Sequence, residues 1–123
     1  MAQHVTVFPL EARSASATSR DFKNSSDGAG QANVGGIIYV SATSVTAGGM
    51  IVNFEGKDPV SNQYYSIISS APIIASGTLI MRVHPDLTAS TGLIAKDMVP
   101  PVWRVRTTVA SGSLTFGVGV SLI

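Results

Sequence analysis

The sequence predicts an all-β fold, either an antiparallel β-sandwich or a jelly-roll-like arrangement of seven to eight strands with an extended N-terminal arm. Apolar and polar residues alternate in short segments that recur about every ten to fifteen residues, with turn-forming residues between them. No segment sustains the period of an amphipathic helix. Because successive side chains of a strand point to opposite faces, the alternation indicates strands with one buried face.

The clearest alternation lies at the C-terminal end of the sequence. Trp103 and Val105 fall on one side of an extended segment, and the arginine between them falls on the other. After a Ser-Gly turn at residues 111–112, the alternation resumes over residues 114–122. We expect these two segments to pair as a β-hairpin with one apolar face, and the only tryptophan places the core here.

Four further segments have strand character, namely residues 37–43, 50–55, 64–68 and 78–83. We expect one domain over residues 1–123, because a chain of this length can bury roughly two thirds of its unfolded surface. The predicted core consists of the inward-facing apolar residues of these strands: Phe54, Leu79, Met81, Val83, Trp103, Val105, Phe116, Val118 and Val120.

The N-terminal third gives weaker signals. Residues 4–10 alternate like a strand, but Pro9 has no N–H to donate, which confines residues 1–10 to an arm or to a sheet edge. An arm of this kind is poorly ordered until a partner ties it down. Residues 11–36 are rich in Ser, Gly and Ala, and we expect them to be partly irregular.

Residues 84–101 form the longest irregular segment of the sequence. A loop of this length is usually functional or closes over another part of the molecule. Its apolar residues, Leu93, Ile94, Met98 and Val99, predict that it packs down, and a short helical turn over residues 93–97 is one option.

The composition limits the classes of partner. Hydrophobic residues make up 45% of the chain and charged residues 12%, about half the usual charged share. The surface is therefore either a Ser/Thr/Gly exterior or one that partner proteins cover. The net charge is +1 without a basic run, so we expect no direct contact with nucleic acid, which needs clustered Lys or Arg.

The absence of cysteine excludes disulfides, zinc thiolate sites and cysteine nucleophiles. The N-terminal residues do not show the basic region and apolar region of a signal peptide, and no window approaches eighteen continuous apolar residues. We expect a protein that is made in a cytoplasm and does not associate with a membrane.

The residues that could carry catalysis are scattered. His4 and His84 are far apart, and several of the seven carboxylates lie in turn-like contexts such as Asp58-Pro59. No Gly-x-Ser-x-Gly elbow and no phosphate-binding loop occur. We therefore expect no enzymatic activity and neither a metal nor a cofactor.

Three arginines lie on strand faces opposite the apolar ones, namely Arg82, Arg104 and Arg106. On neighbouring strands they would form a basic stripe that docks an acidic protein surface, because guanidinium groups pair well with carboxylates. The alternative is ordinary surface ion pairs, since Glu55 and Lys57 occupy the outward face of another strand.

The three tyrosines also have two interpretations, a sugar-binding one and a purely structural one. Tyr39, Tyr64 and Tyr65 could form a flat platform on which a sugar ring stacks. Tyrosines in strands more often place the ring at the core and the hydroxyl at the rim. A carbohydrate-binding module is therefore one alternative function.

Two segments resemble a group of small proteins from the structural gene clusters of tailed bacteriophages. The first is a G-x-D-P-x-S-x-x-Y-Y hairpin at residues 56–65. The second combines P-x-L-T at residues 85–88 with P-x-x-W-R-V at residues 100–105, where Pro101 and Val102 fill variable positions. The resemblance covers about residues 50–120, and residues before it match only in being Ser/Ala-rich.

The resemblance implies a virion component, namely a capsid decoration (cement) protein or, alternatively, a neck or tail component. The implied partners are the major capsid protein, other virion proteins and copies of the chain itself, and the implied location is a virion made in a bacterial cytoplasm. The residues that we expect to bind partners lie in the N-terminal segment and on the outward strand faces: His4, Val5, Val7, Phe8, Pro9, Arg82, Arg104 and Arg106.

Overall fold

A computed structural model describes residues 3–24, 33–45, 48–110 and 112–123, and these residues form ten strands and no helix. Seven strands have six residues or more, which agrees with the predicted seven to eight. They are β1 (Gln3–Arg13), β4 (Gly36–Val45), β5 (Met50–Lys57), β6 (Tyr64–Ser69), β7 (Gly77–Val83), β9 (Val102–Val109) and β10 (Leu114–Leu122). Three are two-residue strands, namely β2 (Ala17–Thr18), β3 (Phe22–Lys23) and β8 (Ile94–Ala95).

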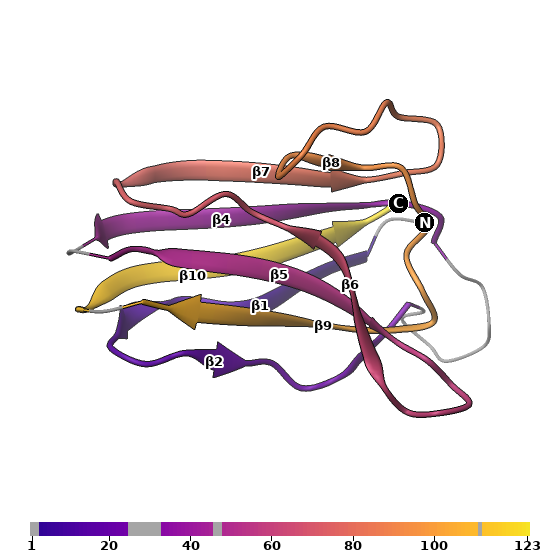
Figure 1. The fold of residues 1–123 in the computed structure, drawn as a ribbon, viewed down its shortest axis with the longest axis horizontal. Coiled ribbons are helices and arrows are strands. Elements are labelled where there is room, and N and C mark those ends of the chain that lie inside the picture. The colour runs from indigo at the N-terminus through magenta and orange to yellow at the C-terminus, as the bar shows by residue number, and fades with distance from the viewer. Residues whose placement is uncertain (1–2, 25–32, 46–47, 111) are drawn as a thin grey trace.

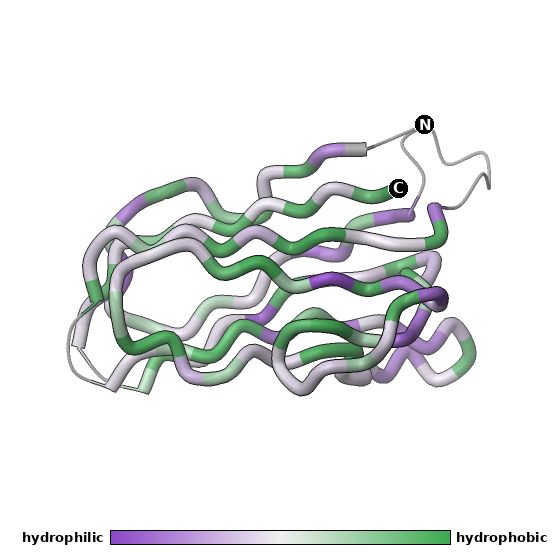
Figure 2. Tube along the Cα trace, turned by 90° about the horizontal axis from the view of Figure 1, so that it is seen from above, coloured by the Kyte–Doolittle hydropathy of each residue, from purple (hydrophilic) through white to green (hydrophobic). Residues whose placement is uncertain are grey.

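The strands form two sheets whose strands run along the long axis of the molecule (Figure 1). Sheet A has the order β1-β10-β4-β7-β8, and sheet B has the order β2-β9-β5-β6, with β3 also paired to β9. All pairs are antiparallel except β7 with β8. Hydrophilic and hydrophobic residues alternate along the traces of both layers (Figure 2), as strands with one buried face require.

The pairing pattern is that of a jelly roll. Strands β1, β2, β4 and β5 pair in reverse order with β10, β9, β7 and β6, as in one long antiparallel ribbon. Rolling this ribbon brings β10 beside β4 and β9 beside β5, which completes the two sheets. The jelly-roll-like prediction is therefore confirmed, and residue alternation alone does not separate it from other sandwiches.

The predicted C-terminal hairpin is wrong, although both of its strands exist. β9 belongs to sheet B and β10 to sheet A, so residues 110–113 connect two layers and not two neighbours in one sheet. The apolar sides of the two strands face each other across the core. An alternating pattern records which face is buried but not which strand lies next to it.

The core lies between the sheets around Trp103, which is fully buried. Its indole stacks on Phe22 at a centroid distance of 4.7 Å and lies 5.3 Å from Phe54. Every residue of the predicted core is buried except Leu79, which is partly buried against the core. Phe22, from the weak N-terminal third, is a core residue that sequence alternation missed.

Of the two alternatives for the N-terminal segment, the edge strand is confirmed for residues 3–10, and the extended free arm is wrong. β1 pairs with β10 from Gln3 opposite Leu122 to Arg13 opposite Leu114. The register shifts between Phe8 and Glu11, and Pro9 lies in this irregularity. A proline fits there because the ladder needs no N–H from it.

The Ser/Gly/Ala-rich segment contributes β2, β3 and the beginning of β4, with connections between them, as the partly irregular prediction required. Asn24 is buried, and its Nδ2 donates to the carbonyls of Asn33 at 2.7 Å and Val99 at 3.0 Å. Residues 25–32, which the same prediction covers, lie outside the described residues.

Residues 84–101 hold a strand and not the predicted helical turn. β8 adds to β7 in parallel, with hydrogen bonds from Arg82 N to Leu93 O at 2.8 Å and from His84 N to Ala95 O at 3.1 Å. The segment is only partly packed down, because Val99 is buried whereas Met98 is 57% exposed.

Candidate interaction surfaces

The predicted partner-binding residues do not form one surface. Arg104 and Arg106 lie on β9 in sheet B, and Arg82 lies on β7 in sheet A. All three alternate with buried residues, so they face outward from opposite sheets of the sandwich. The basic stripe required these strands to be neighbours, and because β7 and β9 lie in different sheets a continuous stripe does not form.

The two arginines of sheet B form ion pairs with a buried carboxylate. Nε of Arg104 donates to Oε1 of Glu55 at 2.8 Å, and Nε of Arg106 donates to Oε2 at 3.1 Å. Nδ2 of Asn53 donates to the same Oε2 at 3.0 Å. The ion-pair alternative is confirmed here, although Glu55 is only 5% exposed and the pairs are more shielded than surface pairs.

A second cluster joins the N-terminal third to the β5–β6 hairpin. Tyr64 Oη donates to the carboxylate of Asp21 at 2.7 Å, and Lys57 Nζ lies 3.2 Å from Oδ2. The hydrogen bond from Tyr64, and then Lys57, lowers the pKa of Asp21, whereas Asp21 raises the pKa of Lys57. The guanidinium of Arg104 lies 3.4 Å from the centroid of the Tyr64 ring, which links the two clusters.

The three tyrosines do not form a common platform. Tyr39 lies on β4 in sheet A, whereas Tyr64 and Tyr65 lie on β6 in sheet B. Arg104 covers the ring of Tyr64. Tyr65 packs closely over Gly56, where an added Cβ would lie 2.6 Å from Cζ of Tyr65. Burial of the Tyr65 hydroxyl is the main cause that raises its pKa.

The N-terminal segment packs three partly buried side chains against the core, whereas most of its described residues are exposed. Val5, Val7 and Phe8 pack against the core, and Phe8 makes an edge-to-face contact with Phe116 at 6.3 Å. His4 is exposed, and its Nδ1 lies 2.8 Å from Ser121 Oγ. Pro9 is also exposed, so partner binding by this segment stays a prediction for those two side chains and the outer backbone of β1.

The outward side of sheet A, which we call the sheet A face, is almost free of charge. The pairing register aligns its side chains in rows, with Tyr39 between Gly119 and Ile80 in one of them. Among the outward positions of the described strands, Arg82 is the one Arg, Lys, Asp or Glu side chain. These positions are His4, Thr6, Ala12, Ile37, Tyr39, Ser41, Ser44, Thr78, Ile80, Arg82, Ile94, Thr115, Gly117, Gly119 and Ser121.

Within the described parts of the chain, no group of three or more His, Cys, Asp or Glu residues could hold a metal ion. In the same parts, no helix long and apolar enough to cross a membrane is present. The two histidines lie on different strands or loops, His4 on β1 and His84 directly after β7.

No family model matches the chain, and no curated protein matches its sequence. The fold is similar to a chain in the structure of infectious bursal disease virus, Gx strain, with 10% sequence identity and a TM-score of 0.45. The match covers 98% of the present chain and 31% of the viral one, so the present chain spans less than a third of that chain's length.

Proposed function

We propose that this chain is a non-enzymatic structural protein of a virion, which attaches in many copies to the shell that a major capsid protein builds. The observation that carries the proposal is the sheet A face, where Arg82 is the one Arg, Lys, Asp or Glu side chain among the described outward strand positions. The cores of protein interfaces are depleted in charge and enriched in aromatic residues, and Tyr39 lies near the middle of this face.

The two outward faces of the sandwich differ in how their charges are used. On sheet B, Arg104 and Arg106 both pair with Glu55, and Asp21 pairs with Lys57. These groups are satisfied within the chain and stabilise it. The sheet A face has no comparable network among the described residues, so burying it against a partner would cost little desolvation of charge.

The jelly-roll topology supports this proposal as an analogy only. Viral capsid proteins, lectin domains and cupins share the architecture, and a fold by itself does not determine function. The sequence resemblance favours the virion of a tailed bacteriophage and, within it, a capsid decoration protein. The proposed partners are the major capsid protein and copies of this chain, without nucleic acid or membrane, and a neck or tail component is the alternative position.

A pair of matched substitutions tests the proposal. Tyr39 and Ile51 lie on central strands of the two sheets and have almost equal exposure, 38% and 37%. We expect Tyr39→Glu to abolish co-sedimentation with shell particles, and Ile51→Glu to leave it unchanged, with both variants folded by circular dichroism. Equal binding of the two variants would refute attachment through the sheet A face.

The carbohydrate-binding alternative predicts different behaviour of the wild-type protein in the particle assay. A glycan-binding module would bind sugar as a free monomer and would not sediment with particles at a fixed ratio. A glycan array on which the wild-type protein binds and Tyr39→Ala does not would favour that function over the structural one.

A further inference from the structure

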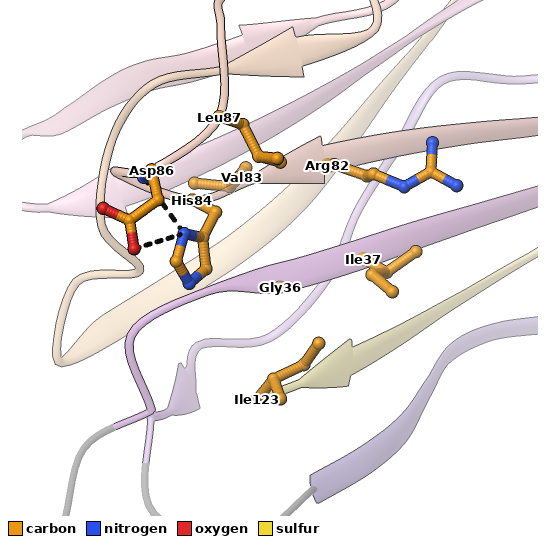
Figure 3. Close-up of a pocket in the computed structure, with 8 residues that line it drawn as sticks. All are labelled: Gly36, Ile37, Arg82, Val83, His84, Asp86, Leu87 and Ile123. Atoms are coloured by element: carbon orange, nitrogen blue, oxygen red, sulfur yellow. Dashed lines mark hydrogen bonds and ion pairs between the residues drawn. The ribbon is translucent and has the colours of Figure 1, made fainter.

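An open hollow of about 340 Å³ lies at one end of sheet A (Figure 3). Ile37, Leu87 and Ile123 give it an apolar lining, whereas Arg82 and His84 supply nitrogen donors. The volume is at the lower end of the range for ligand pockets and is sufficient for one or two side chains.

Arg82 has no partner among the residues that the structure describes, and this distinguishes it from the other four arginines. Arg13 pairs with Glu11 at 3.1 Å, and Arg20 lies 4.1 Å from the ring of Phe22. Arg104 and Arg106 both donate to Glu55. The five N–H donors of the Arg82 guanidinium are therefore not occupied by any of the described residues and are available to a ligand.

His84 is held in a defined orientation. The backbone N–H of Asp86 donates to its Nδ1 at 3.1 Å, so in the neutral ring the proton lies on Nε2, on the opposite side of the ring (Figure 3). The ring packs directly on Gly35, where a Cβ would lie 2.5 Å from Cδ2 of His84. Any larger residue at position 35 would displace the ring.

The one carboxylate at the hollow, among the residues that the structure describes, does not neutralise Arg82. Asp86 Oδ2 lies 3.9 Å from Nδ1 of His84, and the Asp86 side chain is 89% exposed. Figure 3 shows Asp86 and Arg82 at opposite ends of the hollow. A carboxylate of a ligand beside Arg82 would therefore not compete with an acceptor of the described residues for the guanidinium N–H groups.

We propose that this hollow binds a carboxylate next to an aliphatic side chain, presented by an exposed loop of the partner protein. The guanidinium of Arg82 would bind the carboxylate through two parallel hydrogen bonds, and Ile37, Leu87 and Ile123 would contact the aliphatic group. A nucleic-acid phosphate backbone fits less well, because it requires several clustered cations. This inference rests on the proposed function, since it supplies the recognition step of the same attachment.

N-acetyl-leucine is a suitable test ligand because it joins a carboxylate to an isobutyl group. In a titration followed by ¹H–¹⁵N NMR, we expect it to shift the amides of Ile37, Arg82 and His84, and we expect N-acetyl-leucinamide to leave them unchanged. Arg82→Gln should weaken binding about tenfold or more, since a hydrogen bond to a charged group contributes at least that factor. Lys96→Gln removes the same charge from an exposed residue outside the lining and should bind like the wild type.

Three results would overturn the inference: no shift at these amides, equal shifts with the amide analogue, or unchanged affinity in Arg82→Gln. The particle assay separates this inference from the proposed function. If wild type and Arg82→Gln sediment equally with particles, the hollow is not the recognition site and the structural function stands. If the wild type binds N-acetyl-leucine but no particles, the hollow binds carboxylates and the structural function fails.

Discussion

Replacing Trp103 tests whether the aromatic cluster between the sheets holds them together. The side chain is fully buried, stacks on Phe22 and lies against Phe54, so it joins the N-terminal third to two central strands of sheet B. Truncation of a buried Trp to Ala typically costs about 3–5 kcal/mol. The two ring contacts place Trp103→Ala toward the upper part of this range.

The expected change is large relative to the stability of a domain of this size, which is about 5–15 kcal/mol. For about 120 residues, 1 kcal/mol corresponds to roughly 4 °C in Tm, so Trp103→Ala should lower Tm by about 12–20 °C. Thermal unfolding followed by far-UV circular dichroism measures this shift, provided that the variant is soluble.

Trp103→Phe is the matched control. It keeps a ring beside Phe22 and removes the indole N–H, which is buried without a hydrogen-bond partner among the described residues. Because an unpaired buried donor itself costs about 1–3 kcal/mol, we expect Trp103→Phe to lower stability far less than Trp103→Ala. An unchanged Tm in Trp103→Ala, or equal losses in the two variants, would refute this description of the core.

Three further predictions concern the polar clusters and the edge strand. Glu55→Gln should destabilise by about 1–3 kcal/mol in urea unfolding, because Arg104 and Arg106 lose a buried acceptor charge, and an unchanged midpoint would contradict this. The pKa of Asp21 is lowered in the fold, so its stabilisation is present above 3.8 and is lost as the pH falls below that value. The Tm difference between wild type and Asp21→Asn should accordingly shrink as the pH falls from neutral to below 3.8, and a constant difference would refute the pairing. Deleting residues 1–8 should cost about 3 kcal/mol or more, because the core loses the apolar side chains of β1, whereas a free arm would leave Tm unchanged.

Alternation predicted which side of each strand is buried, and this explains the agreement for Met81, Trp103 and Phe116. It did not predict that β9 and β10 lie in different sheets, because a period of two carries no information about neighbours. Phe22 was missed for a related reason, since β3 has only two residues and shows no pattern of its own.

The candidate site was less accessible to sequence reasoning. Arg82, Arg104 and Arg106 look equivalent in the sequence, each on the polar side of a strand. Only the pairing of β9 with β5 shows that two of them share Glu55, while the third lies on the opposite sheet. The lining of the hollow combines the beginning of β4, the end of β7 and the C-terminal residue, and it includes His84, which packs on Gly35; strand alternation does not predict that these segments meet.

The ratio of this chain to the major shell protein in purified particles tests the central claim most directly. Quantitative mass spectrometry of particles from successive density gradients measures it. A structural protein bound to a lattice predicts a ratio that is constant between preparations and independent of the excess of free chain. A ratio that varies with purification, or falls to zero in infectious particles, would contradict the proposed function.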